Sequence, residues 1–135
     1  MLKKLITLLL YASLTLTIAS CGDDDDDEET TTTPSVTSTW SSINTYMLGD
    51  GGCMSGCHAS GGTAAGIFQL VSGNATTNYS AVTASSTRVN TGTPTSSTLL
   101  SIPSGTSHSG GQKFTSGSTT YNAILEWIQG GAQNN

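Results

Sequence analysis

The chain has 135 residues, and its nine carboxylate side chains against four Lys and Arg give a net charge of −5. Seven of the nine carboxylates lie in residues 23–29, and the later charges, Asp50, Arg88, Lys113 and Glu126, cancel. A neutral domain with so few basic residues argues against a nucleic acid as partner, because nucleic-acid binding relies on clustered Lys and Arg.

Residues 1–20 have the pattern of a secretory signal peptide. Lys3 and Lys4 precede an apolar stretch over residues 5–18, and small residues stand directly before Cys21. This ending resembles a bacterial lipobox, which implies cleavage before Cys21 and attachment of lipid to its sulfur. The alternatives are an ordinary signal peptide and an uncleaved anchor, for which the apolar run is short. We expect an extracytoplasmic protein, lipid-anchored to the outer membrane on its periplasmic or cell-surface side.

Residues 21–37 are predicted to form a disordered tether. Like charges at the density of residues 23–29 repel one another and do not pack, and four threonines follow them. One interpretation is a spacer that holds the domain off the membrane. The other is a sorting signal, because an acidic run after a lipid-bearing cysteine resembles the surface-export signals of Bacteroidetes lipoproteins.

Residues 38–135 are predicted to form one small domain, bounded by two helices. The first runs from about residue 38 to 48, with Val36, Trp40, Ile43 and Met47 at helical spacing. The second runs from about residue 119 to 129, with apolar residues on one face and two glycines after it. Because the apolar residues are few and small, we expect the core to need a disulfide, a metal or a large apolar cofactor.

The stretch between the helices, residues 59–117, is read mainly as loop, with a short extended segment at residues 67–71 and a helical turn at residues 99–100. Trp40 and Trp127 are predicted to pack the two helices together; direct contact with a cofactor is the alternative. Tyr79 and Phe114 are expected in the core or in a cofactor pocket.

The segment Cys53-Met54-Ser55-Gly56-Cys57-His58 carries the strongest chemical signal. Two cysteines with a histidine directly after the second fasten a c-type haem, because the thiols bond its vinyl groups and the imidazole ligates the iron. The usual spacing has two residues between the cysteines and this chain has three, a longer loop that Gly56 helps to accommodate. We predict haem c attached to Cys53 and Cys57, with His58 as proximal iron ligand.

His108 is the predicted distal ligand, since the chain has only two histidines. Met54 lies inside the attachment loop and Met47 belongs to the first helix, so we expect bis-histidine ligation. The alternative is an exposed loop histidine, which leaves the iron five-coordinate or bound to water. Arg88 and Lys113 are each expected either to contact a haem propionate or to be a solvated surface charge.

Further short signals follow the cysteine motif in an order that resembles the cytochrome c-like domains of bacterial lipoproteins, particularly of Bacteroidetes and Planctomycetes type. They are an apolar step, a tyrosine segment, a Gly-x-Pro-x-x-Ser-x-Leu-Leu turn and a Trp-Ile-x-x-Gly-Ala helix, here Gly66–Leu70, Tyr79–Val82, Gly92–Leu100 and Trp127–Ala132. The resemblance covers residues 38–135 and implies a mostly α fold whose N- and C-terminal helices cross beside the haem. Many members carry Met-Pro near the position of His108, so this chain departs from the family at its sixth ligand.

These features predict a membrane-tethered monohaem electron carrier rather than an enzyme, with a redox partner protein of unknown identity. Asp50 and Glu126 stand alone, so no acid–base pair is expected. One alternative is a zinc site made by the two cysteines and two histidines. Another is a binding or adhesion module with a Cys53–Cys57 disulfide, and a third is a small haem enzyme, such as a peroxidase, with an open distal position.

Overall fold

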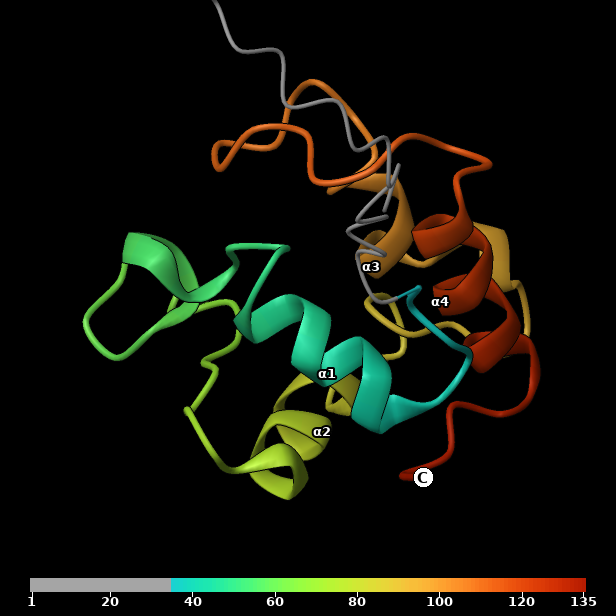
Figure 1. Ribbon diagram of the computed structural model, residues 1–135, viewed down its shortest axis with the longest axis horizontal. Helices are drawn as coiled ribbons and strands as arrows, with labels where there is room; N and C mark the ends of the chain where they lie inside the picture. The colour runs from blue at the N-terminus through green and yellow to red at the C-terminus, as the bar shows by residue number, and fades with distance from the viewer. Residues whose placement is uncertain (1–34) are drawn as a thin grey trace, which may run out of the picture. The chain divides into compact units, whose positions relative to one another are not determined.

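The computed structural model describes residues 35–135, and every regular element in this range is helical (Figure 1). The elements are α1 Trp40–Leu48, η1 Met54–His58, α2 Ala75–Thr83, η2 Pro94–Ser96, α3 Thr98–Ser101 and α4 Thr119–Gln129. The mostly α prediction is thereby confirmed. The predicted signal peptide, Cys21 and the tether up to residue 34 lie outside the described residues.

The two predicted bounding helices are present as α1 and α4. The Thr39 side chain accepts a hydrogen bond from the Ser42 amide at the start of α1, and Ser118 does the same for Tyr121 at the start of α4. Each helix buries one face, which consists of Trp40, Ile43, Asn44 and Met47 in α1 and Ala123, Ile124, Trp127 and Ile128 in α4. Within residues 35–135, no helix is long and apolar enough to cross a membrane.

Trp40 and Trp127 pack α1 against α4, as predicted. Their ring centroids are 5.5 Å apart, and each indole N–H donates to a backbone carbonyl, that of Ala75 and that of Gln133 respectively. Tyr79 meets Trp40 edge to face at 5.6 Å, and its hydroxyl donates to the Ala132 carbonyl. Tyr79 is therefore half-buried and packs against the core.

The prediction of a loop over residues 59–117 is wrong at α2, which spans nine residues. Asn74 caps this helix by accepting from the Thr77 amide, but only Asn78 and Val82 are buried along it. Such a short apolar face produces little periodicity. The expected turn at residues 99–100 is present as α3, whereas residues 67–71 form no strand.

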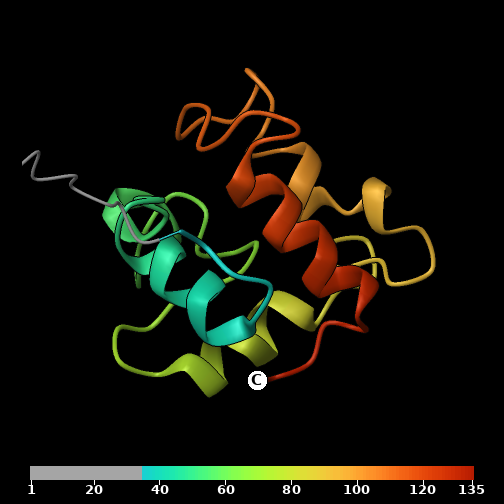
Figure 2. The same ribbon diagram turned by 45° about the vertical axis from the view of Figure 1, so that its right-hand side comes forward.

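The helices form two packed groups. α1 lies on α2, while α4 packs against η2 and α3, and Figure 2 shows these two groups side by side. Residues 49–74 and 102–118 connect the helices without long regular elements. These two connecting segments contribute most of the chemistry-bearing side chains described next.

Candidate functional site

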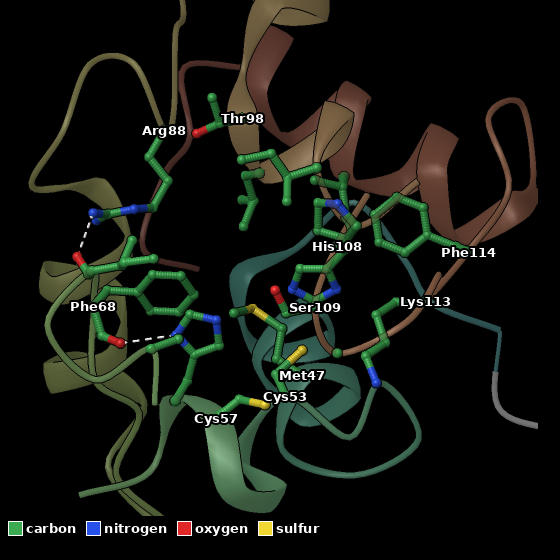
Figure 3. Close-up of a pocket in the computed structure, with 18 of the residues that line it drawn as sticks. Met47, Cys53, Cys57, Phe68, Arg88, Thr98, His108, Ser109, Lys113 and Phe114 are labelled. Carbon is green, nitrogen blue, oxygen red and sulfur yellow. Dashed lines mark hydrogen bonds between the residues drawn. The ribbon is translucent and has the colours of Figure 1, made fainter. Parts of the chain in front are cut away.

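A pocket with a volume of about 520 Å³ brings together the residues singled out in the sequence. This volume lies within the roughly 300–1,000 Å³ of small-molecule and cofactor sites. The pocket is lined by all six predicted site residues of the domain, Cys53, Cys57, His58, Arg88, His108 and Lys113 (Figure 3). Much of the remaining wall is apolar, including Met47, Phe68, Leu99, Ile102, Phe114 and Ile124.

The cysteine segment accommodates its extra residue in a wide turn. The amide of His58 donates to the carbonyl of Cys53, five residues earlier, at 3.0 Å. Inside this turn Ser55 leaves the helical region, and Gly56 has φ 75° and ψ −5°. This left-handed conformation is unfavourable for residues with a Cβ, so the predicted role of Gly56 is confirmed for the backbone.

Both cysteines are partly exposed free thiols at the pocket wall. Burial raises the pKa of the Cys53 thiol above its ordinary value, while Lys113 opposes this rise and Cys57 adds to it. This raised pKa favours the neutral thiol form of Cys53. Tyr46 lies beside it, and burial followed by the charges of Cys53 and Asp50 raises the pKa of its hydroxyl, which donates to the Lys113 carbonyl at 2.8 Å.

His58 is almost fully buried, with 7% of its surface exposed. Its Nδ1 lies 3.0 Å from the carbonyl oxygen of Phe68. A carbonyl only accepts hydrogen bonds, so Nδ1 carries the proton and Nε2 carries the lone pair. The Phe68 ring also stacks on the imidazole, with centroids 3.9 Å apart. His58 is thus held in the tautomer and orientation that a metal ligand through Nε2 requires.

His108 is fixed in the same tautomer by a different loop. Its Nδ1 lies 2.9 Å from the carbonyl of Gly111, whose amide donates back to the His108 carbonyl at 2.8 Å. Figure 3 shows Phe68 and His108 on opposite sides of the pocket. Because His58 stacks on Phe68, the two imidazoles approach the pocket from opposite sides. Fifty residues of sequence separate them.

Arg88 has partners that neither interpretation of the sequence included. Its guanidinium donates to the carbonyls of Ala81 at 2.6 Å, Val82 at 3.2 Å and Ile67 at 2.7 Å. It also lies 4.9 Å from the centroid of the Phe68 ring. Burial lowers the pKa of Arg88, but a guanidinium stays protonated at any ordinary pH. Arg88 therefore joins the end of α2 to the segment that follows the cysteines.

Sequence reasoning missed the position of Met47. The helical spacing assigned it to the buried face of α1, and its exposed fraction of 4% agrees. However, the same side chain lines the pocket and points into it (Figure 3). The reason for excluding Met47 as an iron ligand is therefore wrong, because one buried side chain faces both the core and the pocket. Only the helical spacing of apolar residues was available as a signal. This spacing does not distinguish a side chain in the core from one that lines a pocket.

The structure also bears on the zinc alternative and on the predicted place of Phe114. Among residues 35–135, no three or more His, Cys, Asp and Glu side chains are gathered so that they could hold a metal ion, as the zinc interpretation requires. Phe114, expected in the core or the pocket, lines the pocket and contacts Tyr46 and Tyr121.

Comparison of the chain with family models, curated proteins and solved structures found no match.

Proposed function

We propose that this chain is a c-type cytochrome with a single haem, which carries electrons between partner proteins outside the cytoplasm. The observation that supports it most is the convergence of four side chains at one largely apolar pocket. Cys57 directly precedes His58 and Cys53 lies five residues before it, while His108 enters from the opposite side. Both histidines have Nε2 available for ligation, because each Nδ1 donates to a carbonyl.

These residues fit a haem in kind and number. Cys53 and Cys57 would hold it through thioether bonds, and His58 and His108 would be the two axial ligands. Haem supplies a one-electron iron couple when it is bound. The apolar wall would keep water away from the haem. On the side of α3 and α4, Leu99, Ile124 and Phe114 form this wall. Lys113, the second cation on this wall, is the better candidate for a propionate partner, because the Arg88 guanidinium already donates to three carbonyls.

The proposal includes the predicted lipid anchor at Cys21 and the acidic tether. One electron would arrive from a reduced protein and leave to an oxidised one, without transfer of atoms, so no acid–base pair is needed. The near-neutral charge of the domain beyond residue 34 suits partners that are recognised through apolar contact rather than through strong charge complementarity.

A spectroelectrochemical titration tests this function. The full chain would be produced with a cytochrome c maturation system, purified in detergent, and titrated between its oxidised and reduced forms. We expect a reversible change in the haem absorption that fits one electron per chain. A haem protein that consumes hydrogen peroxide and does not cycle reversibly would instead support the enzyme alternative. A colourless protein that contains zinc would support the metal-site alternative.

A further inference from the structure

Three side chains form a stack on the wall of the pocket, in the order Arg88, Phe68 and His58. The guanidinium carbon of Arg88 lies 4.9 Å from the centroid of the Phe68 ring, within the range of a cation–π contact. The same ring also stacks on the His58 imidazole, with centroids 3.9 Å apart and the two planes 19° apart. We call this arrangement the Arg88–Phe68–His58 stack.

Phe68 contacts His58 in two ways. Its ring packs on the imidazole, and its backbone carbonyl accepts the hydrogen bond from Nδ1 at 3.0 Å (Figure 3). The carbonyl belongs to a segment without regular secondary structure, so no ladder of helical hydrogen bonds fixes its direction. The amide of Leu70 also donates to the carbonyl of His58 at 2.7 Å, which holds the same segment close.

Arg88 fixes this segment to the rest of the domain. Its NH2 group donates to the carbonyl of Ile67, directly before Phe68, and its NH1 group donates to Ala81 and Val82 in the last turn of α2. The helix end presents unsatisfied carbonyls with partial negative charge, which a guanidinium complements. A planar group with several donors can connect two segments at once, and a lysine ammonium cannot reproduce that geometry.

We propose that Arg88 is a positioning residue for the iron ligand His58, acting through Phe68. This inference rests on the proposed haem site and deepens it. With Arg88 in place, the Phe68 carbonyl stays aligned with Nδ1, and this hydrogen bond makes Nε2 a stronger electron donor. A stronger donor favours ferric over ferrous iron, so the stack keeps the reduction potential low. Arg88 thus affects the iron indirectly, through the hydrogen bond that orients its ligand His58.

The test compares two variants of the stack with one charge control, all as full chains that carry haem. R88K keeps the positive charge and loses the planar fork, while F68L keeps the backbone carbonyl and loses the ring. K113M removes the charge of the other cation on the pocket wall. Each protein would be measured by redox titration and by electron paramagnetic resonance of the ferric state, whose g-values respond to the orientation of the ligand imidazole.

We expect R88K and F68L to shift the midpoint potential upward and to change the g-values. K113M should shift the potential downward, because it removes a positive charge that favours ferrous iron. An R88K protein and an F68L protein with the wild-type potential and g-values would overturn the inference. If R88K fails to fold, R88Q is measured in its place, and a change in its g-values decides, because R88Q also lacks the fork that joins Ile67 to the end of α2.

Failure of the proposed function would look different. A wild-type protein that carries no covalent haem after maturation overturns both proposals together. A wild-type protein with haem, combined with unchanged R88K and F68L, overturns the role of Arg88 and leaves the cytochrome proposal standing.

Discussion

At the residue scale, the two histidines make the same kind of hydrogen bond. Each donates its Nδ1 proton to a backbone carbonyl, that of Phe68 for His58 and that of Gly111 for His108. The carbonyl partner fixes the tautomer and restricts ring rotation, which reduces the entropy lost when a metal binds. For His108 the partner lies only three residues away, so a short turn carries both the histidine and its hydrogen-bond acceptor.

Under the proposed bis-histidine ligation the ferric iron is low spin, and replacing His108 with Ala should convert it to high spin. The sixth ligand is lost, and a five-coordinate or water-bound iron has a weaker ligand field. The measurement is the absorption and electron paramagnetic resonance spectrum of the ferric protein at neutral pH.

Met47→Leu is the matched control, because it removes the thioether that points into the pocket with little change in volume. It should leave the low-spin spectrum in place. The reverse pattern, with H108A unchanged and M47L converted to high spin, would make Met47 the sixth ligand.

Gly56 offers a second test at this scale, because only its backbone conformation constrains it. A Cβ built at Gly56 or at Gly66 meets no atom within 4 Å, but Gly56 has φ 75° and Gly66 has no positive φ. Gly56→Ala should lower the free energy of unfolding by about 1–2 kcal/mol, the usual cost of a left-handed residue with a Cβ.

Gly66→Ala should leave the free energy of unfolding unchanged or raise it slightly, because Ala restricts the unfolded chain. Urea titrations of both variants measure these values. Equal effects at the two positions would show that the wide turn at the cysteines does not need a left-handed residue.

At the scale of elements, α1 and α2 are joined by a buried polar bridge. The side-chain Nδ2 of Asn78 donates to Asn44 Oδ1 at 2.8 Å and to the Val71 carbonyl at 3.0 Å. Its Oδ1 accepts from the backbone amide of Val71 at 2.7 Å. Both asparagines are buried, with exposed fractions of 0% for Asn78 and 6% for Asn44. Satisfied buried networks of this kind specify how two helices meet.

Asn78→Ala should therefore lower the free energy of unfolding by about 1–3 kcal/mol, because it leaves Asn44 and the Val71 backbone without their partners. Urea unfolding followed by circular dichroism measures the change. Asn122→Ala is the control, since Asn122 is exposed and its side chain donates only to the Gly117 carbonyl in the structure described. A control effect as large as that of N78A would contradict the importance of the bridge.

The elements also show how far sequence reasoning reaches. α1 and α4 were predictable because each repeats apolar residues at helical spacing and carries a Ser or Thr cap. α2 was not, because one of its two buried positions is Asn78, which reads as a loop residue. At the site, cysteine and histidine spacing indicated the pocket. The roles of Phe68 and Arg88 were not predictable, because the hydrogen bonds of His58 and Arg88 go to backbone carbonyls, which every residue has.

At the scale of the whole molecule, the core and the pocket share a wall. Met47, Leu99 and Ile124 are buried core residues that also line the pocket. The two helix groups therefore meet at the Trp40–Trp127 contact, and residues from both groups also line the pocket. We expect an apolar cofactor seated there to complete the core, since small domains with few large apolar residues usually need such support.

The central claim is covalent attachment of haem at Cys53 and Cys57, and one measurement tests it directly. Wild-type protein and a C53S/C57S double variant, both produced with a cytochrome c maturation system, are denatured, separated on a gel and stained for haem. Denaturation removes any haem that is not covalently bound. We expect a stained band for the wild-type protein and none for the double variant. A wild-type band without stain would contradict it.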